Sequence, residues 1–344
     1  RSTRQKMTIG TQADSVQETT GETDRQTTGS AAGDATNSTG GNYSGRAGGA
    51  LSAMRPYLDL MRADRPVGTL LLLWPTLAAL WLAADGFPPL GLLLVFTLGT
   101  WLMRSAGCVI NDIADRKIDG HVTRTVSRPL ATGTVSTRQA VLLFLGLAAT
   151  AGCLLVFLND LTRLLAVAGL GIAALYPFMK RWTYLPQVVL GAAFSWGLIM
   201  AYSAVQGRLP IDAWLLFIAS LTWIVAYDTM YAMVDRDDDL KIGVRSTAIL
   251  FGAQDRLMIG LLQAVTLTAL LLLAEVIAAR GAFQLGILAA AGFFLYQHYL
   301  IRHRQRDACC AAFANNVWVG FSWGAGAVLE RSRLPVRAGM PVGG

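Results

Sequence analysis

Apolar runs long enough to cross a lipid bilayer recur along this chain from Pro66 almost to its C-terminal end. A helix needs about 20 apolar residues to span the hydrocarbon core. Because lipid offers no hydrogen-bond partner to an open backbone, each run is predicted to be a helix. The predicted spans are 66–84, 91–110, 139–158, 161–179, 186–205, 212–234, 256–279, 282–300 and 309–329. We therefore expect an all-α integral membrane protein with nine transmembrane helices around a central cavity.

The distribution of charge agrees with this fold class. Of the 344 residues, 53% are hydrophobic and only 15% are charged, and the net charge is +7. With the N-terminus in the cytoplasm, most basic residues fall in the inner loops, as the positive-inside rule requires. These bases are Arg55, Arg62, Arg65, Arg116, Lys117, Arg124, Arg128, Arg138, Lys180, Arg181, Arg236, Lys241, Arg245, Arg256, Arg302, Arg304 and Arg306. The positive charge is thus a topology signal, and we expect membrane lipid and no nucleic acid as partner.

The two ends of the chain differ from the part between them. Residues 1–50 are rich in Gly, Ser and Thr and poor in large apolar side chains, so we expect them to be disordered. We assign residues 51–335 to the transmembrane domain and residues 336–344 to a short C-terminal tail. The four cysteines and three histidines show neither a disulfide framework nor the spacing of a zinc site.

Two acidic clusters follow directly on apolar runs, and charge placed beside lipid demands a reason. The first reads NDIADRKID (111–119) and the second DRDDD (235–239). If the helices continue into the clusters, side chains at four-residue intervals lie above one another on one face of each helix. The stacked residues would be Asn111, Asp115 and Asp119 in the first cluster, with Asp112 beside them, and Asp235 and Asp239 in the second.

Both clusters fall on the predicted cytoplasmic side, where two opposed carboxylate faces would repel each other unless a cation lay between them. Hard oxygen ligands favour Mg²⁺, which binds through carboxylates together with substrate phosphates. A solvated loop is one alternative, and a calcium loop is another, although the second cluster lacks the Gly and the terminal Glu of an EF-hand. Two clusters on one side, flanked by bases that could neutralise phosphate, favour the metal; these bases are Arg116, Lys117, Lys180 and Arg181.

The two clusters are also preceded by similarly placed charges. Arg104 lies seven residues before Asn111, and Asp228 lies seven before Asp235, which suggests two related helical bundles that meet at one site. Both charges would lie about 10 Å inside the membrane by helical rise. We expect Arg104 and Asp228 to pair as a structural tie; the alternative is that Arg104 holds a substrate carboxylate. Arg65 is expected to be a membrane anchor rather than a carboxylate partner.

The clusters match two motifs of the UbiA prenyltransferase superfamily, NDxxDxxxD and DxxxD. Three longer stretches resemble its bacterial 4-hydroxybenzoate polyprenyltransferase branch: NDIADRKIDGHVTRTVSRPLATG (111–133), YPFMKRWTYLPQVVLGAAF (176–194) and YDTMYAMVDRDDDLKIGVRSTAILFG (227–252). RADRPVGTLLLLWPTLAALW (62–81) resembles the first helix of that branch. The resemblance covers residues 55–329.

This resemblance implies an Mg²⁺-dependent enzyme of ubiquinone biosynthesis in the bacterial inner membrane, with its N-terminus and active site facing the cytoplasm. It would transfer the polyprenyl group of a polyprenyl diphosphate to the ring carbon ortho to the hydroxyl of 4-hydroxybenzoate. The expected metal ligands are Asn111, Asp115, Asp235 and Asp239. The catalytic candidates are Asp115, Asp119, Asp235, Asp239, Arg116 and Arg181, and the substrate-binding candidates are Asn111, Asp112, Lys117, Lys180, Arg104 and Tyr231.

Other interpretations stay open at this point. Aromatic faces could stabilise an allylic cation, and Trp223, Tyr227 and Tyr231 lie on the sixth predicted helix, but helix packing explains them equally well. A carrier or channel would also account for intramembrane charges and a repeat, although it has less need of two metal-binding clusters at one membrane face. Within the superfamily, dihydroxynaphthoate or haem could be the acceptor, and the stretches at 176–194 and 227–252 disfavour both.

Overall fold

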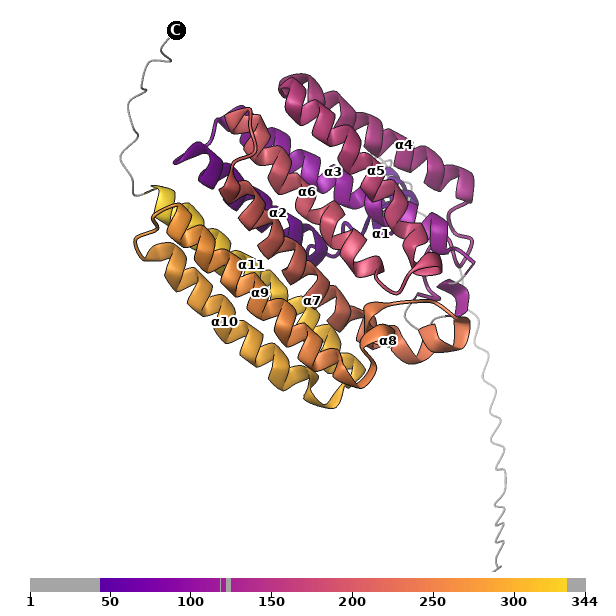
Figure 1. Ribbon diagram of the computed structural model, residues 1–344. Coiled ribbons are helices and arrows are strands. Elements are labelled where there is room, and N and C mark those ends of the chain that lie inside the picture. The colour runs from indigo at the N-terminus through magenta and orange to yellow at the C-terminus, as the bar shows by residue number, and fades with distance from the viewer. Residues whose placement is uncertain (1–43, 118, 122–124, 333–344) are drawn as a thin grey trace, which may run out of the picture. The chain divides into compact units, whose positions relative to one another are not determined.

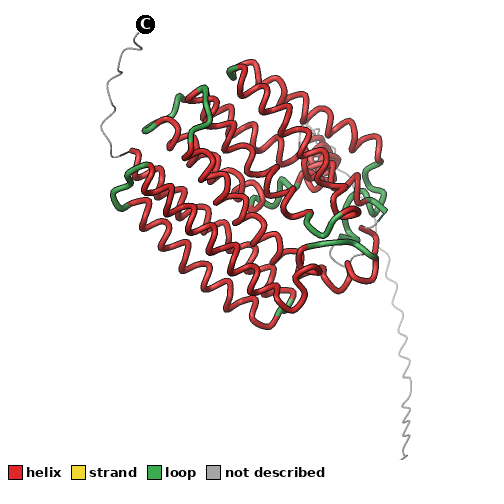
Figure 2. The backbone as a smooth tube through the Cα atoms, in the orientation of Figure 1, coloured by secondary structure: helices red, strands yellow, loops and turns green. Residues whose placement is uncertain are grey.

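The computed structural model describes residues 44–332 apart from 118 and 122–124, and within these residues the chain folds into helices without a strand (Figure 2). The helices are α1 (Ser44–Met61), α2 (Val67–Ala84), α3 (Leu90–Asp115), α4 (Thr137–Cys153), α5 (Asp160–Trp182), α6 (Pro186–Gln206), α7 (Ile211–Ile242), α8 (Thr247–Phe251), α9 (Asp255–Val276), α10 (Ala282–Leu300) and α11 (Arg306–Ser332). Short 3₁₀ segments are η1 (Asp119–His121), η2 (Leu154–Phe157), η3 (Gly252–Gln254) and η4 (Ile301–His303).

Eight segments of the described chain are long and apolar enough to cross a membrane, and they correspond to the first eight predicted spans. The ninth predicted span falls in α11, which has 27 residues but does not reach the same apolar composition. Part of the reason is that α11 carries polar side chains that face other helices, since Asn316 and Glu330 are only 1% and 7% exposed. The prediction of an all-α, multi-pass membrane protein is therefore confirmed, whereas the count of nine spans is not.

One helix precedes the first predicted span and was not expected. α1 begins inside segment 1–50, whose composition predicts disorder, while most of that segment and the predicted C-terminal tail lie outside the described residues. Leu60 near the end of α1 is fully buried and belongs to the same apolar cluster as Leu102 of α3. The burial of such apolar side chains between α1 and α3 holds α1 on the bundle.

Two helices continue beyond the apolar runs that predict them. α3 extends to Asp115 rather than ending near residue 110, and α7 extends to Ile242 rather than ending near residue 234. Leaving the membrane does not end a helix, because its backbone hydrogen bonds are internal and serve equally well in water. α7 ends where Gly243 adopts a left-handed conformation, with φ of 74°. Both acidic clusters therefore begin on helical backbone.

The long helices lie side by side (Figure 1). α4 and α5 lie at one edge of the bundle, α9, α10 and α11 lie at the other, and α2, α6 and α7 lie between them. At the centre, Trp223 of α7 is fully buried and meets Tyr227 edge to face, with ring centroids 5.3 Å apart. The Trp223 indole N–H donates to Asn316 of α11 at 2.8 Å, so α7 and α11 share a packed and hydrogen-bonded core.

The outer helices expose apolar side chains, as a surface that faces lipid requires. Leu164 of α5 is 67% exposed and Leu295 of α10 is 74% exposed. In water, such a continuous apolar surface would drive association. In a bilayer, lipid tails solvate this apolar surface. The packing between membrane helices therefore depends on close van der Waals contact rather than on excluding water.

Glycines allow α10 and α11 to approach closely, and this generates a prediction. A Cβ atom on Gly286 would lie 2.5 Å from the backbone oxygen of Ser322 in α11, so the two helices would have to separate. We predict that Gly286→Ala lowers the stability of the detergent-solubilised protein by about 1–3 kcal/mol, measured by thermal unfolding. Gly292→Ala is the matched control on the same helix, because open space surrounds its Cβ position. Equal melting temperatures for the two variants would contradict the close-packing argument.

Candidate active site

One large cavity, about 1150 Å³ in volume, lies among α2, α3, α5, α6, α7 and α11. Both acidic clusters reach it, since Asn111 and Asp112 line it from the end of α3, and Asp235 and Asp239 line it from the end of α7. Farther along the helices its wall becomes apolar, through residues such as Val95, Phe96, Leu155, Leu158 and Met200. The cavity thus joins a charged end to an apolar arm.

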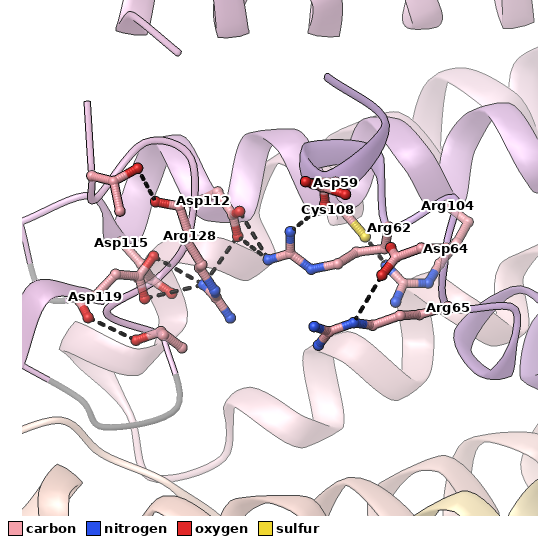
Figure 3. A network of polar contacts seen from close by, with 12 residues as sticks. Asp59, Arg62, Asp64, Arg65, Arg104, Cys108, Asp112, Asp115, Asp119 and Arg128 are labelled. Carbon is pink, nitrogen blue, oxygen red and sulfur yellow. Dashed lines mark hydrogen bonds and ion pairs between the residues drawn. The ribbon is translucent and has the colours of Figure 1, made fainter. Parts of the chain in front are cut away.

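In the first cluster, Asp112 lies between the side chains of Arg62 and Arg128 (Figure 3). Its side chain is 1% exposed and forms ion pairs with Arg62 at 2.9 Å and with Arg128 at 3.0 Å. Arg128 also pairs with Asp119 at 2.9 Å. A buried carboxylate is tolerated only when it is paired, and here both arginines come from segments outside α3. These ion pairs therefore fix the loop before α4 and the end of α1 against α3.

The expected helical stacking of Asp119 is wrong. α3 ends at Asp115, and Asp119 opens the separate 3₁₀ turn η1. Gly120, which follows Asp119, is a poor helix former. The ion pair of Asp119 with Arg128 holds the chain in a turn here instead of a further helical turn. Asn111 and Asp115 do share one helix at four-residue spacing, as expected.

Asp119 nevertheless belongs to the cluster, because Arg128 binds both Asp119 and Asp112. Its side chain is buried, and this burial raises the pKa of the Asp119 carboxyl above its ordinary value. The Arg128 guanidinium opposes the rise, while the nearby carboxylates of Asp115 and Asp112 add to it. The cluster therefore holds three carboxylates close enough to repel one another.

Asp115 connects the first cluster to α5. The ammonium group of Lys180 lies 3.1 Å from the Asp115 carboxylate, and Lys180 lines the cavity. Arg181 donates to the backbone oxygen of Ala114 at 2.7 Å. The two adjacent bases of α5 thus both reach the end of α3, one facing the cavity and the other outside its lining.

Arg116 and Lys117 lie outside the cavity lining. Both are exposed, and Arg116 donates to the backbone oxygen of Ile113 on its own helix at 2.8 Å. Adjacency to the acidic motif suggested a direct role for both. In the structure, the side chains of both residues face away from the cavity.

The second cluster divides between two directions. Asp235 and Asp239 are four residues apart on α7 and line the cavity. Asp237 is 77% exposed, whereas Asp238 is buried and pairs with Arg306 of α11 at 3.2 Å. One face of the helix thus serves the cavity, and the others face solvent or neighbouring helices.

Deeper in the cavity, Arg104 lies against α2. Its guanidinium donates to Cys108, its Nε is buried without a hydrogen-bond partner in the described part of the chain, and a Cβ atom on Gly68 would collide with it. Asp228 lines the same cavity. The predicted Arg104–Asp228 tie stays a prediction. So does the role of Arg65, which lines the cavity but is 73% exposed and pairs with neighbouring Asp64.

Of the three aromatic candidates, Tyr227 and Tyr231 line the cavity and Trp223 does not. Tyr231 lies against Phe313 of α11, with ring centroids 4.5 Å apart. Trp223 packs against α11 instead, so its interpretation as a packing residue holds.

The donors at the charged end fit a hard divalent cation in kind. Among the described residues, no three acidic, His or Cys side chains lie close enough to enclose a metal ion together. However, the Asn111 side-chain oxygen is buried without a hydrogen-bond partner in that part of the chain, beside a cavity lined by further oxygen donors of Asp235 and Asp239. An all-oxygen donor set suits Mg²⁺ completed by substrate oxygens and water.

Sequence reasoning missed two residues that hold the site together. Arg62 and Arg128 were interpreted only as topology charges, yet both bind Asp112 and both line the cavity. The signal available in sequence was their position, one just before the first span and the other nine residues after Asp119. Nothing in that spacing says that both side chains fold back onto one carboxylate.

Fold and site together define a multi-pass membrane protein with a cavity that is charged at one end and apolar along its depth. The sequence profile of the UbiA prenyltransferase family matches residues 72–323. The 4-hydroxybenzoate octaprenyltransferase of Tolumonas auensis is 60% identical over 275 residues, covering 80% of this chain and 96% of its own. The enzyme of the same name from Chromohalobacter salexigens is 57% identical over 280 residues, covering 81% and 94%. The chain belongs to the UbiA prenyltransferase family and is a membrane-embedded prenyltransferase.

Solved structures agree on the fold. A UbiA homolog from Aeropyrum pernix K1 superposes with a TM-score of 0.68 at 24% identity, covering 76% of this chain and 97% of its own. A UbiA homolog from Archaeoglobus fulgidus, solved bound to GPP and Mg²⁺, has a TM-score of 0.60 at 18% identity and covers 80% and 99%. At these identities the likeness establishes the shared architecture.

Arg128 generates a prediction about stability, because it neutralises two buried carboxylates. Arg128→Ala should destabilise the metal-free protein by about 3 kcal/mol, since Asp119 loses its described partner and Asp112 keeps only Arg62. Thermal unfolding in detergent measures the effect. Arg138→Ala removes an exposed arginine at the start of α4 and should leave the melting temperature unchanged. Equal stability of the two variants would mean that the Arg128 ion pairs contribute nothing.

Proposed function

We propose that this chain is a 4-hydroxybenzoate polyprenyltransferase, which moves the polyprenyl group of a polyprenyl diphosphate to the acceptor carbon ortho to the hydroxyl, a step of ubiquinone biosynthesis. The observation that carries the proposal is that both acidic clusters and Lys180 line one cavity, which continues into an apolar arm. The names of the relatives that are 55–60% identical support this acceptor and suggest an octaprenyl donor.

In the proposed reaction, the allylic C–O bond of the donor breaks and diphosphate leaves with the electron pair. The allylic carbocation then forms a C–C bond to the ring carbon, and that carbon loses its proton to solvent or to the released diphosphate. Charge develops on the leaving group, so preplaced cations stabilise the transition state. Water must be kept from the carbocation, which the apolar arm accomplishes by excluding it.

The charged end of the cavity suits a metal–diphosphate pair. When bound, Mg²⁺ would supply positive charge to the oxygens of the leaving diphosphate. We assign Asn111, Asp115, Asp235 and Asp239 to hold it. The unpartnered buried oxygen of Asn111 and the cavity-lining positions of Asp235 and Asp239 support this assignment.

The surrounding residues are assigned by what they touch. Lys180 would donate to diphosphate oxygens, because it already points at the cavity beside Asp115. Asp112 and Asp119 would support the site indirectly, since both hold Arg128 in place. Tyr231 would form part of an aromatic wall that faces the carbocation.

We assign three further bases to attracting the anionic donor to the cavity rather than to binding it directly. Arg116, Lys117 and Arg181 are exposed and lie outside the cavity lining. Their charge would raise the local concentration of the anionic donor at the cavity entrance. This role predicts sensitivity to ionic strength, because exposed charges are screened by salt.

We assign Arg104 to the acceptor carboxylate, which is the alternative to its expected tie with Asp228. Its buried Nε without a described partner and its place on the cavity wall support this assignment. An arginine in a dry site binds a carboxylate strongly through parallel hydrogen bonds. The ring would then lie between Arg104 and the acidic clusters, which is the order the reaction needs.

We further propose that the protein lies in the bacterial inner membrane with its N-terminus and charged cavity end in the cytoplasm. The loop charges support this orientation through the positive-inside rule. It would place both water-soluble substrate groups, the diphosphate and the aromatic acid, on the side where they are made.

The function is tested with purified protein, octaprenyl or geranyl diphosphate, 4-hydroxybenzoate and Mg²⁺, with product measured by mass spectrometry. We expect a ring-prenylated product, its loss with EDTA and its return with added Mg²⁺. Asp235→Ala and Asp115→Ala should abolish turnover. Asp237→Ala is the matched control, because its side chain is 77% exposed on the same helix.

One outcome would overturn the proposed reaction, and another would overturn only the metal assignment. Absence of prenylated product, with transport of a solute instead, would make the protein a carrier. Full activity in Asp235→Ala or Asp115→Ala would remove these carboxylates from the metal site while leaving the reaction in place.

Gly68 allows a separate prediction about Arg104. A Cβ atom there would collide with the Arg104 guanidinium group, so Gly68→Ala should displace that side chain. We expect the KM for 4-hydroxybenzoate to rise by about tenfold while the KM for the donor is unchanged. Gly146→Ala, with open space around its Cβ position in α4, is the control. Equal rises in both KM values would favour a structural role for Arg104, such as the tie to Asp228.

A further inference from the structure

The described structure contains a fully buried carboxylate that the proposed reaction does not use. Asp255, the first residue of α9, has a side chain that is 0% exposed. Arg304 donates to it from two nitrogens, Nε at 2.9 Å and Nη2 at 2.7 Å, and Arg236 lies 3.4 Å away. Removing any one of these three side chains would leave a buried charge with fewer partners, which is strongly destabilising. The three residues are called the α7 clamp below.

The first arginine of the α7 clamp belongs to the second acidic cluster. Arg236 follows Asp235 directly, but it points away from the cavity, toward Asp255 and the backbone oxygen of Gly252 at 3.3 Å. Asp235 and Asp239 line the cavity from the same stretch of helix. Because side chains on a helix are fixed relative to one another, holding Arg236 on one side orients Asp235 and Asp239 on the other.

The second arginine occupies an unusual backbone position. Arg304 follows η4 with φ of 54°, a left-handed conformation that a glycine would adopt more easily. Its side chain spans the turn before α11, reaching Asp255 and also the backbone oxygen of Ala253 at 2.8 Å. The side chain thus supplies contacts that a glycine would lack, and it joins the α10–α11 turn to the start of α9.

A further ion pair acts in the same direction. Arg306, the first residue of α11, binds Asp238 of α7 at 3.2 Å. Asp238 is buried and lies one residue before Asp239. The end of α7 is therefore held by α9 through Arg236 and by α11 through Asp238, while Asp235 and Asp239 line the cavity.

We propose that Asp255 is a positioning residue: through the α7 clamp it fixes the end of α7 so that Asp235 and Asp239 are presented to the metal and diphosphate. This inference rests on the proposed function of those two carboxylates. Residues that support ligands from behind typically change metal affinity by about 10–100-fold when they are removed. The acceptor site at Arg104 lies on α3 and should be unaffected.

The test compares Asp255→Asn with Glu330→Gln. Glu330 is also buried and also accepts hydrogen bonds from a neighbouring helix start, at Arg280 and Phe283, but it lies at the far end of α11. For Asp255→Asn we expect the half-saturating Mg²⁺ concentration and the donor KM to rise by about tenfold, with the acceptor KM unchanged. Asp255→Glu should recover part of the loss. Glu330→Gln should shift none of these constants.

A second measurement does not depend on turnover. Mg²⁺ with inorganic pyrophosphate should raise the melting temperature of the wild-type protein and of Glu330→Gln, and it should do so less for Asp255→Asn at equal concentrations. If Asp255→Asn does not fold, Arg236→Gln, whose side chain is 27% exposed, takes its place with the same expected direction.

The outcomes separate the inference from the function it rests on. Unchanged Mg²⁺ and donor constants in the clamp variants, or an equal shift in Glu330→Gln, would overturn the α7 clamp. A wild-type protein that makes no product would overturn the proposed function. The pyrophosphate-dependent stabilisation would then still decide whether Asp255 positions the anion site.

Discussion

The site depends on pairing buried carboxylates with bases that come from other parts of the chain. Asp112 is held by Arg62 and Arg128, and Asp115 is held by Lys180. An unpaired carboxylate beside lipid would be prohibitively costly, so each acid needs its base before the fold is stable. Each ion pair also joins two segments distant in sequence. The electrostatic requirement therefore builds the geometry of the cavity mouth.

Under the proposed function, the same pairing makes substrate binding electrostatically inexpensive. Metal and diphosphate carry opposite charges, so Asp115 would exchange its contact with Lys180 for the metal, and Lys180 would exchange Asp115 for a diphosphate oxygen. One set of ion pairs is exchanged for another, with little change in the net charge of the cavity. This exchange needs carboxylates and bases to be interleaved, as Asp115 and Lys180 are.

The sequence predicts the first eight spans and the meeting of both clusters, because apolar length and loop charge act locally and need no partner. It does not predict α1 or the break after Asp115, because these depend on contacts with residues far away in the chain. It also misjudges which bases face the site. Arg116 is adjacent to the motif but exposed, whereas Arg128 lies in a later loop and binds two of its acids. Adjacency in sequence does not fix the direction of a side chain.

The second cluster shows why such a motif has to be divided by helix geometry. Five consecutive charged residues on a helix, at about 100° per residue, cannot share one face. In α7, Asp235 and Asp239 face the cavity, Asp237 faces solvent, and Arg236 and Asp238 contact neighbouring helices. Of the residues between the two cavity-facing acids, Arg236 and Asp238 therefore have a role of their own, which is to form ion pairs with neighbouring helices. The charges of Arg236 and Asp238 let polar contacts with neighbouring helices hold the end of α7.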